Sequence, residues 1–253
     1  MIKSKTLSRF KNIKHAFFNR LGGKSTGIFR SLNCGTGSSD NNEIVLKNLE
    51  MVRKKIESKS KKIVLLNQIH SNKFHYINKN SKLKHNKFEG DALITDKRNI
   101  PIAVLTADCA PILMYDKNNK MIAAIHAGWK GAYKDVVKNT VDFMIKKGCT
   151  ANNITAVIGP CISLKNYEVK TAFIKKFIKK DKKTKIFFKK IKNKNYFNLN
   201  AYVAYQLKSL NINKIEVINK DTFNIKNNFF SARRSKSHNE NDYGRNISVI
   251  MIN

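Results

Sequence analysis

The chain has 253 residues, of which 42% are hydrophobic, so it is long enough to bury a sizeable core, and we expect one domain over residues 1–253. Four widely spaced cysteines without a Cys-x-x-Cys pair argue against a disulfide framework and a structural zinc knuckle. The formal net charge is +33. No apolar run is long enough to span a membrane, and the first residues lack the apolar stretch of a signal peptide, so we expect a cytoplasmic protein without a membrane partner. We also expect a monomer.

Hydrophobic periodicity predicts helices and strands that alternate along the chain. Helical spacing of apolar residues predicts helices at residues 43–57, 136–145, 171–178 and 201–210. Short apolar runs predict strands at residues 61–68, 74–77, 100–105, 112–115, 121–125, 154–158, 215–218 and 247–252. The turn at 116–119 predicts a hairpin, and Gly148 is expected to end the helix before it. Hairpins beside crossovers favour a layered α/β fold, in which helices flank a mixed β-sheet core.

The lysines are scattered among asparagines and isoleucines rather than gathered on one motif with interleaved aromatic residues. The densest stretch, residues 175–194, alternates lysines with apolar residues such as Ile186 and Phe187. Lysine stems can cover apolar surface there while the ammonium groups stay in water. We interpret the charge as a solvated surface and expect no specific nucleic-acid partner, although non-specific association with polyanions is expected at low salt.

Three short segments, residues 68–71, 106–111 and 126–131, each place a nitrogen or sulfur ligand at the end of an apolar run. A strand followed by a polar or glycine-punctuated turn holds its last side chain firmly and leaves it accessible. We therefore expect His70, Cys109 and His126 to form the functional site, assembled by adjacent strands. Two imidazoles and a thiolate suit zinc and leave a fourth position open. Spacing alone favours the alternative of two ordinary hydrogen-bonded histidines and a small buried cysteine, because intervals of 39 and 17 residues are not diagnostic of a metal site.

Taken in order, these and further segments resemble the YfiH-like family, known both as multicopper polyphenol oxidases of the laccase type and as purine nucleoside phosphorylases with adenosine deaminase activity. The resemblance covers nearly the whole chain. It rests on residues 15–25, 31–35, 67–70, 90–95, 107–112, 126–131, 158–162, 167–169 and 229–234, followed by Gly244-Arg245. Two positions depart from the family pattern. Lys130 stands where arginine is commoner, and Asp221 precedes Thr222 where the family usually has cysteine.

The resemblance implies a single YfiH-like catalytic domain, whose layered fold is also likened to cysteine hydrolases of the cytotoxic necrotizing factor type. It implies that His70, Cys109 and His126 are zinc ligands, and that Arg20 and Asn33 line the same pocket. The implied substrates are a purine nucleoside and phosphate.

A zinc with three protein ligands can lower the pKa of bound water towards about 7, which would allow attack on C6 of adenine and hence deamination. Phosphorolysis instead needs a cation for phosphate, and Arg20 is the first candidate because a guanidinium matches phosphate geometry, followed by Arg245 and Lys24. We also expect Asp108 to act with Cys109 and His126 in catalysis, and Asp91 to contribute to the substrate pocket or to orient a ligand histidine.

Two other functions remain open at this stage. A metal-free hydrolase acting on amide bonds, as in the editing of peptidoglycan precursors, would use Cys109 as nucleophile and His126 as base. A polyphenol oxidase would need copper, but six histidines are few for a cluster of several copper centres, so we favour zinc.

Overall fold

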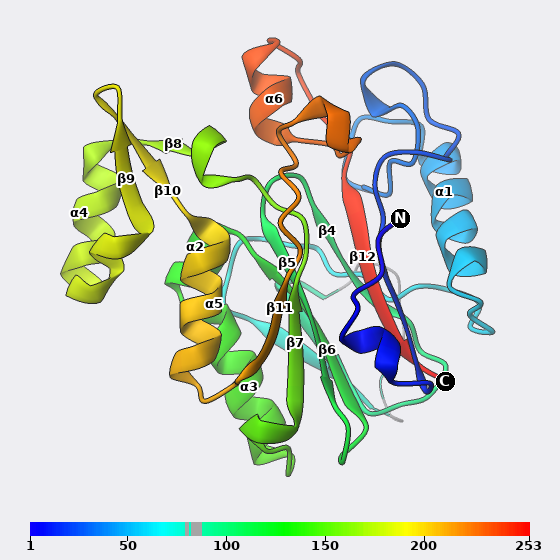
Figure 1. Ribbon diagram of the computed structural model, residues 1–253. Helices are drawn as coiled ribbons and strands as arrows, with labels where there is room; N and C mark the ends of the chain where they lie inside the picture. The colour runs from blue at the N-terminus through cyan, green and yellow to red at the C-terminus, as the bar shows by residue number, and fades with distance from the viewer. Residues whose placement is uncertain (79–80, 82–87) are drawn as a thin grey trace.

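The computed structural model describes residues 1–78, 81 and 88–253, and its centre is a mixed β-sheet, as predicted. Six strands lie in the order β11-β7-β5-β6-β3-β2 (Figure 1). The inner pairs are antiparallel, whereas the two edge strands, β11 and β2, pair in parallel with their neighbours. The strands are β2 (Phe74–Ile77), β3 (Ala92–Thr95), β5 (Ala110–Asp116), β6 (Met121–Ala127), β7 (Ile154–Ile158) and β11 (Lys214–Val217).

A second, antiparallel sheet packs on one face of the first. It consists of β1 (Ile13–Phe17), β12 (Asn246–Ile252) and β4 (Ile102–Thr106), in that order. Side chains alternate along β5, so Leu113 and Tyr115 face this second sheet while Ile112 and Met114 face the opposite side. Burial on both faces explains why the sequence of β5 is a nearly continuous apolar run.

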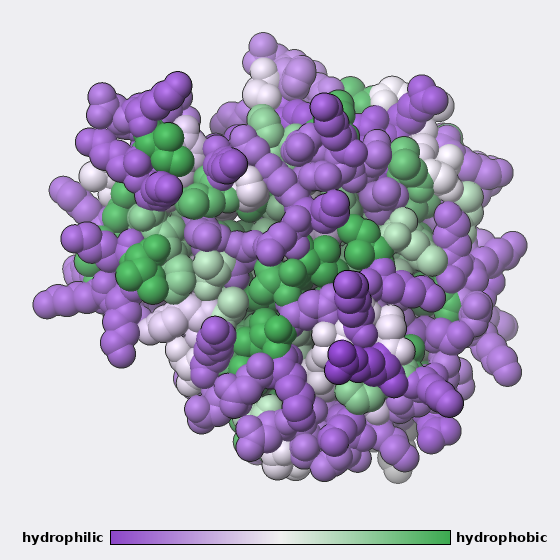
Figure 2. All heavy atoms as spheres, viewed as in Figure 1, coloured by the Kyte–Doolittle hydropathy of each residue, from purple (hydrophilic) through white to green (hydrophobic). Residues whose placement is uncertain are grey.

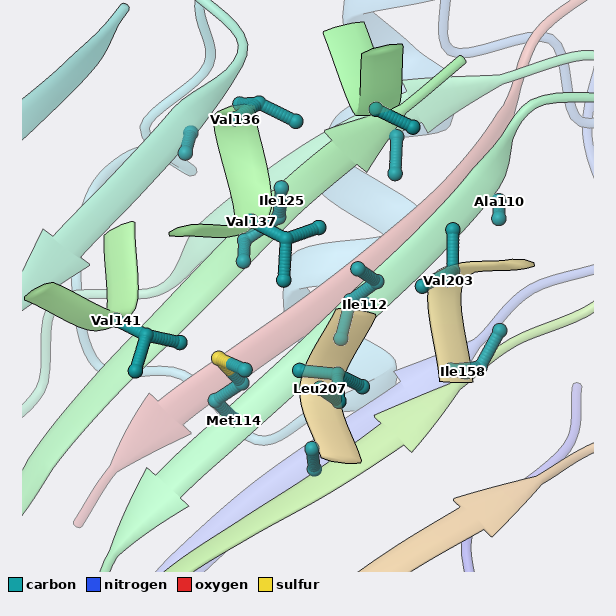
Figure 3. Close-up of a cluster of buried hydrophobic side chains, with 14 of the residues drawn as sticks. Ala110, Ile112, Met114, Ile125, Val136, Val137, Val141, Ile158, Val203 and Leu207 are labelled. Atoms are coloured by element: carbon teal, nitrogen blue, oxygen red, sulfur yellow. The ribbon is translucent and has the colours of Figure 1, made fainter. Parts of the chain in front are cut away.

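Helices cover the two outer faces of the paired sheets. Side chains of α3 (Val136–Lys146) and α5 (Leu199–Ser209) pack on the six-stranded sheet, and Figure 3 shows Val137 and Leu207 close to Ile112. Residues of α1 (Asn42–Lys55) pack on the outer face of the second sheet. The layers are therefore helix, sheet, sheet and helix. No helix in the described ranges has both the length and the apolar composition to cross a bilayer.

A third sheet lies at one flank of the molecule, beside the helical layer of α5 (Figure 1). Its strands are β8 (Glu168–Val169), β10 (Lys194–Phe197) and β9 (Phe188–Ile191), and α4 (Thr171–Lys180) packs against them. The remaining short elements are α2 (Trp129–Tyr133), α6 (Ala232–Ser237), η1 (Leu7–Arg9), η2 (Gly27–Phe29), η3 (Ala151–Asn153), η4 (Leu164–Asn166), η5 (Lys182–Phe187) and η6 (Ile225–Asn227).

The structure confirms the four predicted helices, the hairpin of β5 and β6, and the role of Gly148, which has a φ of +94° just after α3. The strand predicted at residues 61–68 is wrong. That segment pairs with β4 through a single bridge, Val64 to Ile102. The side-chain amide of Gln68 then donates a hydrogen bond to the backbone oxygen of Leu105 and accepts one from its backbone N–H, at 2.7 Å each. A side chain thus replaces the backbone ladder that a strand would continue. Strands β1, β3, β8, β9 and β10 were not predicted.

Candidate functional site

Strand pairing brings the three predicted ligands together. His126 lies near the end of β6, and antiparallel pairing with β5 places Pro111 opposite it, so that Cys109, just before β5, lies beside it. His70 comes from the loop that follows residues 61–68. One nitrogen or sulfur atom from each residue lies within 4.8 Å of the others, and the distance from Cys109 Sγ to His70 Nε2 is 3.8 Å. In the described residues this is the one group of three His, Cys, Asp or Glu side chains that has metal-binding geometry.

The buried carboxylate of Asp91 orients both histidines. Its Oδ1 accepts hydrogen bonds from His126 Nδ1 at 2.8 Å and from the backbone N–H of His70 at 3.0 Å. Its Oδ2 accepts from the backbone and the hydroxyl of Ser71, at 2.5 and 2.7 Å. Burial raises the pKa of Asp91, but these donors outweigh burial and lower it, so the group is ionised. With Nδ1 of His126 held by Asp91, Nε2 is the nitrogen that remains for a ligand.

The site favours the charged form of its cysteine. Burial raises the pKa of Cys109, but the neighbouring imidazoles of His126 and His70 outweigh burial and lower it to about 7. Burial likewise lowers the pKa of His126, while Cys109 and Asp91 outweigh it and raise it to about 9. A thiolate is the form that binds metals, and two imidazoles with one thiolate match the ligand preference of zinc. The donor set therefore fits the expected ion.

Asp108 lines a cavity beside His70 and Cys109, but three hydrogen-bond donors hold its carboxylate. Its carboxylate accepts hydrogen bonds from Thr222 Oγ1 at 2.7 Å, Ser231 Oγ at 3.0 Å and the backbone N–H of Arg233 at 2.7 Å. Burial raises its pKa against these stabilising contacts. Its φ of +83° is rare for a residue with a side chain. These contacts hold the turn that carries Cys109, so the geometry favours a positioning role, and the catalytic role stays a prediction.

Two cavities meet at the three ligands. The first, of about 360 Å³, is lined by all three ligands together with Gln68, Arg245 and the loop 35–37. The second, of about 520 Å³, is lined by His70 and Cys109 together with Tyr167, Arg233 and Lys236. Tyr243 borders both cavities. His70 and Cys109 line both cavities, so a small molecule in either cavity would lie beside the ligand group.

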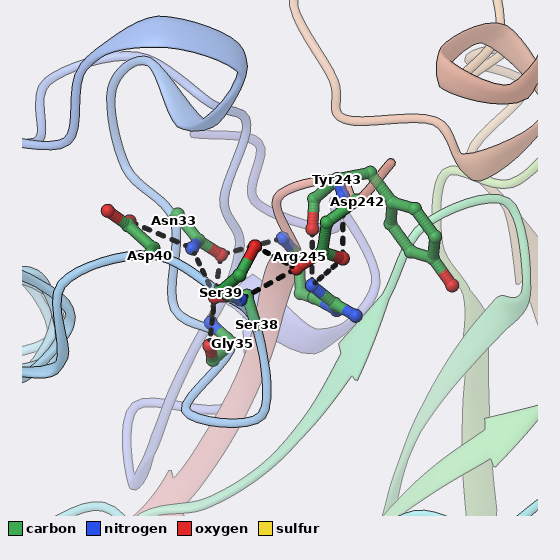
Figure 4. Close-up of polar contacts among 8 residues, drawn as sticks. All are labelled: Asn33, Gly35, Ser38, Ser39, Asp40, Asp242, Tyr243 and Arg245. Atoms are coloured by element: carbon green, nitrogen blue, oxygen red, sulfur yellow. Dashed lines mark hydrogen bonds and ion pairs between the residues drawn. The ribbon is translucent and has the colours of Figure 1, made fainter. Parts of the chain in front are cut away.

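Arg245 lines the first cavity, whereas Asn33 does not line it and instead forms hydrogen bonds with the backbone of the residues that do. The Asn33 side chain accepts hydrogen bonds from the backbone N–H groups of Gly35 and Arg245, at 3.0 and 2.9 Å, and donates to Ser38 and Asp40 (Figure 4). The Arg245 guanidinium donates to Asp242 at 2.8 Å and lies 4.4 Å from the centroid of the Tyr243 ring. Asn33 thus joins the loop 35–38 to Arg245.

Arg20 lines neither cavity. Its guanidinium lies 5.6 Å from the centroid of the Phe230 ring, and its backbone N–H and C=O bond to other loops. Lys24 is also outside the lining residues of both cavities. The predicted phosphate role of Arg20 is therefore without support from its position, while Arg245 has the position that such a role needs.

Sequence reasoning missed the aromatic and basic residues that border the cavities, namely Tyr243, Tyr167 and Lys236. Tyr167 and Arg245 belong to segments that carry the family resemblance, but no spacing rule marks Tyr243 or Lys236 as site residues.

The family departure at Asp221 has a structural outcome. Its carboxylate accepts from Ser163, Asn166 and the backbone of Phe223, so hydrogen bonds join the two loops there.

Gly128, which follows β6, is expected to be essential for metal binding because there is no space for a side chain. An added Cβ would lie 2.7 Å from Cys109 Sγ and 2.9 Å from His70 Cδ2. The backbone (φ −70°, ψ 163°) suits alanine, so Gly128→Ala should keep the fold and displace the ligands. Elemental analysis should find little zinc in this variant. Gly37→Ala is the control, because its Cβ would meet nothing within 4 Å. Equal zinc contents in the two variants would contradict the expectation.

The fold and the His-Cys-His group together define a class of layered α/β proteins with a candidate metal centre. Residues 14–253 match the family described as multi-copper polyphenol oxidoreductase laccase. The chain belongs to this family, which includes the YfiH proteins. It is similar to the Bacillus licheniformis protein YfiH, with a TM-score of 0.87 and 27% identity over 95% of this chain and 93% of that one. A Neisseria meningitidis structure gives a TM-score of 0.85 and 30% identity over 96% and 95% of the chains.

Curated relatives carry a second description. A protein from Rickettsia prowazekii named purine nucleoside phosphorylase is 36% identical over 85% of this chain and 87% of its own length. A protein of the same name from Bacteroides thetaiotaomicron is 32% identical over 100% of this chain and 96% of its own length. The resemblance inferred from the sequence is thus confirmed, and the chain is a member of a family of enzymes.

Proposed function

We propose that this protein is a zinc-dependent purine nucleoside phosphorylase that also deaminates adenosine. The observation that carries the proposal is the convergence of His70, Cys109 and His126, oriented by Asp91, at the boundary of two cavities. The names of the curated relatives support a nucleoside and phosphate as substrates. We further propose a single catalytic domain over residues 1–253 that acts as a cytoplasmic monomer.

Phosphorolysis breaks the bond between the ribose anomeric carbon and the base nitrogen, and the bonding electron pair leaves with the base. A phosphate oxygen forms the new bond to that carbon. The bound zinc would supply Lewis acidity beside both substrates. We assign phosphate to the first cavity, where Arg245 and the backbone of the loop 35–37 border the site. We assign the nucleoside to the second cavity, where Tyr167 and Tyr243 offer aromatic surface to a base.

Product analysis tests the proposed reactions directly. The purified protein is incubated with adenosine, inosine or methylthioadenosine, each with and without phosphate. Phosphorolysis predicts free base and a pentose 1-phosphate only when phosphate is present, whereas deamination predicts inosine from adenosine in either condition. Absence of all these products from a zinc-loaded, folded protein would refute the proposal.

Purified protein is expected to contain close to one zinc per chain, because one group of three suitable ligands is found in the described part of the chain. Elemental analysis gives the metal content. Alkylation of Cys109 should be slow in the loaded protein and become fast after chelation, since zinc shields the thiolate. No zinc, together with equal alkylation rates before and after chelation, would argue for a metal-free site.

Replacing Arg245 by alanine is expected to raise the KM for phosphate roughly 10- to 100-fold, because a charge-assisted hydrogen bond contributes about 1.5–3 kcal/mol. The KM for the nucleoside should change much less. Arg20→Ala is the matched control, since it removes the same group outside both cavities. If Arg20→Ala raises the phosphate KM and Arg245→Ala does not, the assignment from sequence holds and the one from position fails.

A cysteine hydrolase is a second candidate, and one observation favours it. In this arrangement Cys109 is the nucleophile, with its thiol pKa lowered to about 7, His126 is the base, and the Asp91 carboxylate orients His126. This arrangement suits cleavage of amide bonds without a metal. It differs from the zinc site in one testable respect, because His70 is a ligand in the zinc site and has no chemical step in the hydrolase.

A further inference from the structure

A lysine-rich lobe stands apart from the site. We define the lysine lobe as residues 170–194, which form α4, η5, β9 and the first residue of β10. Lysine occupies 12 of its 25 positions, whereas Lys and Arg together make up 50 of 253 residues in the chain, so the lobe is enriched well beyond the composition of the protein. The lysines are Lys170, Lys175, Lys176, Lys179, Lys180, Lys182, Lys183, Lys185, Lys189, Lys190, Lys192 and Lys194.

The charges of the lobe face solvent and are largely unneutralised. All twelve lysines are exposed. Within the described parts of the chain, only Lys180 and Lys194 form ion pairs, with Asp135 at 2.7 Å and Glu168 at 3.0 Å. The single acidic residue of the lobe, Asp181, accepts hydrogen bonds from the backbone of Lys183 and the hydroxyl of Tyr205. The lobe is therefore a concentrated source of positive potential.

A packed aromatic interior fixes the shape of the lobe. Phe173 and Phe177 of α4 stack with ring centroids 4.8 Å apart, and Phe177 lies 5.0 Å from Phe197 of β10. The lysines project outward from this interior on a helix, a 3-10 turn and a strand. Figure 1 places these elements together at one flank, and Figure 2 shows hydrophilic side chains over much of that flank. The charged groups thus cover a surface whose underlying elements are held in place by aromatic packing.

The residue types in the lobe indicate what it binds. No arginine occurs among residues 170–194, and lysine is a compact point charge that contacts phosphates without the planar fork that gives arginine its bidentate specificity. Insertion into a membrane surface would need apolar groups, but Ile186, 76% exposed, is the one large apolar side chain of the lobe that is mostly exposed to solvent. We propose that the lysine lobe binds the phosphodiester backbone of nucleic acid, independently of base sequence.

The test compares two variants with the same change in net charge. The lobe variant carries Lys179→Gln, Lys183→Gln, Lys185→Gln and Lys189→Gln. The control variant carries Lys59→Gln, Lys61→Gln, Lys62→Gln and Lys117→Gln, all exposed positions outside the lobe. Binding of the full chain to a labelled 30-nucleotide single-stranded RNA, and to a DNA duplex of mixed sequence, is followed by fluorescence anisotropy over a range of potassium chloride concentrations.

The lobe variant should bind both probes at least about 10-fold more weakly at low salt. The slope of log K against log salt should fall in magnitude by up to about 2.8 for the RNA and about 3.6 for the duplex, since each of four phosphate contacts contributes about 0.7 or 0.9 respectively. The control variant should stay within about twofold of the unmodified protein. Equal losses in the two variants, or none in either, would overturn the proposal. Tighter binding to phosphatidylserine vesicles that Ile186→Ser abolishes would assign the lobe to membranes instead. Phosphorolysis should persist in both variants, so this test is independent of the proposed activity.

Discussion

Replacing His70, Cys109 or His126 by alanine is expected to lower the rates of phosphorolysis and deamination more than about 10³-fold. The three residues act as a unit, so the loss of any one removes most of the catalytic effect of all three. A double replacement should be scarcely worse than a single one for the same reason. Steady-state assays on folded, purified variants measure both activities. His75→Ala and Cys149→Ala are suitable controls. His75 lies in the edge strand β2, where its ring forms a hydrogen bond with the backbone oxygen of Glu89, and Cys149 is buried outside the ligand group.

His70→Ala also distinguishes the two candidate functions. In the zinc site, loss of His70 leaves two protein ligands, and the metal is neither tightly held nor correctly polarised. In the cysteine hydrolase, Cys109 and His126 remain intact, and loss of His70 removes only one of the two imidazoles that lower the pKa of the thiol, so activity should fall much less. A folded His70→Ala protein that keeps near-normal turnover while Cys109→Ala is inactive would move the function to the hydrolase.

Asp91→Asn is expected to reduce zinc affinity and activity about 10- to 100-fold, the range typical for groups that orient metal-ligating histidines. Asparagine keeps the shape of the side chain but removes the charge, and its amide N–H₂ group must face either the His70 and His126 donors or the Ser71 donors. Competition with a metal-binding dye measures the affinity, and kcat measures the activity.

Ser71→Ala is the control for Asp91→Asn, because it removes one hydrogen bond to the same carboxylate and leaves the contact to His126 unchanged. Its effect on zinc affinity should be a small fraction of that of Asp91→Asn. Comparable effects from the two substitutions would show that general loosening of the loop, rather than orientation of His126, is responsible.

Long periodic segments made much of the fold predictable. Val136, Val137 and Val141 recur at helical spacing and face the sheet, and the apolar run of β5 is buried on both faces. The short edge strands β8 and β9 escaped prediction, because two to four residues with interspersed lysines carry no clear period. Segment 61–68 has the apolar content of a strand, but the Gln68 side chain decides its pairing, and pattern reasoning cannot detect this.

The sequence by itself determined the layered α/β class, the family, and the three residues at the centre of the site, because each of these is written in local patterns or in the order of short motifs. Only the tertiary structure decided how other residues relate to that centre. It places Arg245 at the cavity and Arg20 outside it, and turns the carboxylate of Asp108 towards Thr222. The physical reason is that the direction of a side chain depends on contacts with residues distant in sequence, such as Thr222 and Ser231, and no local periodicity encodes those contacts.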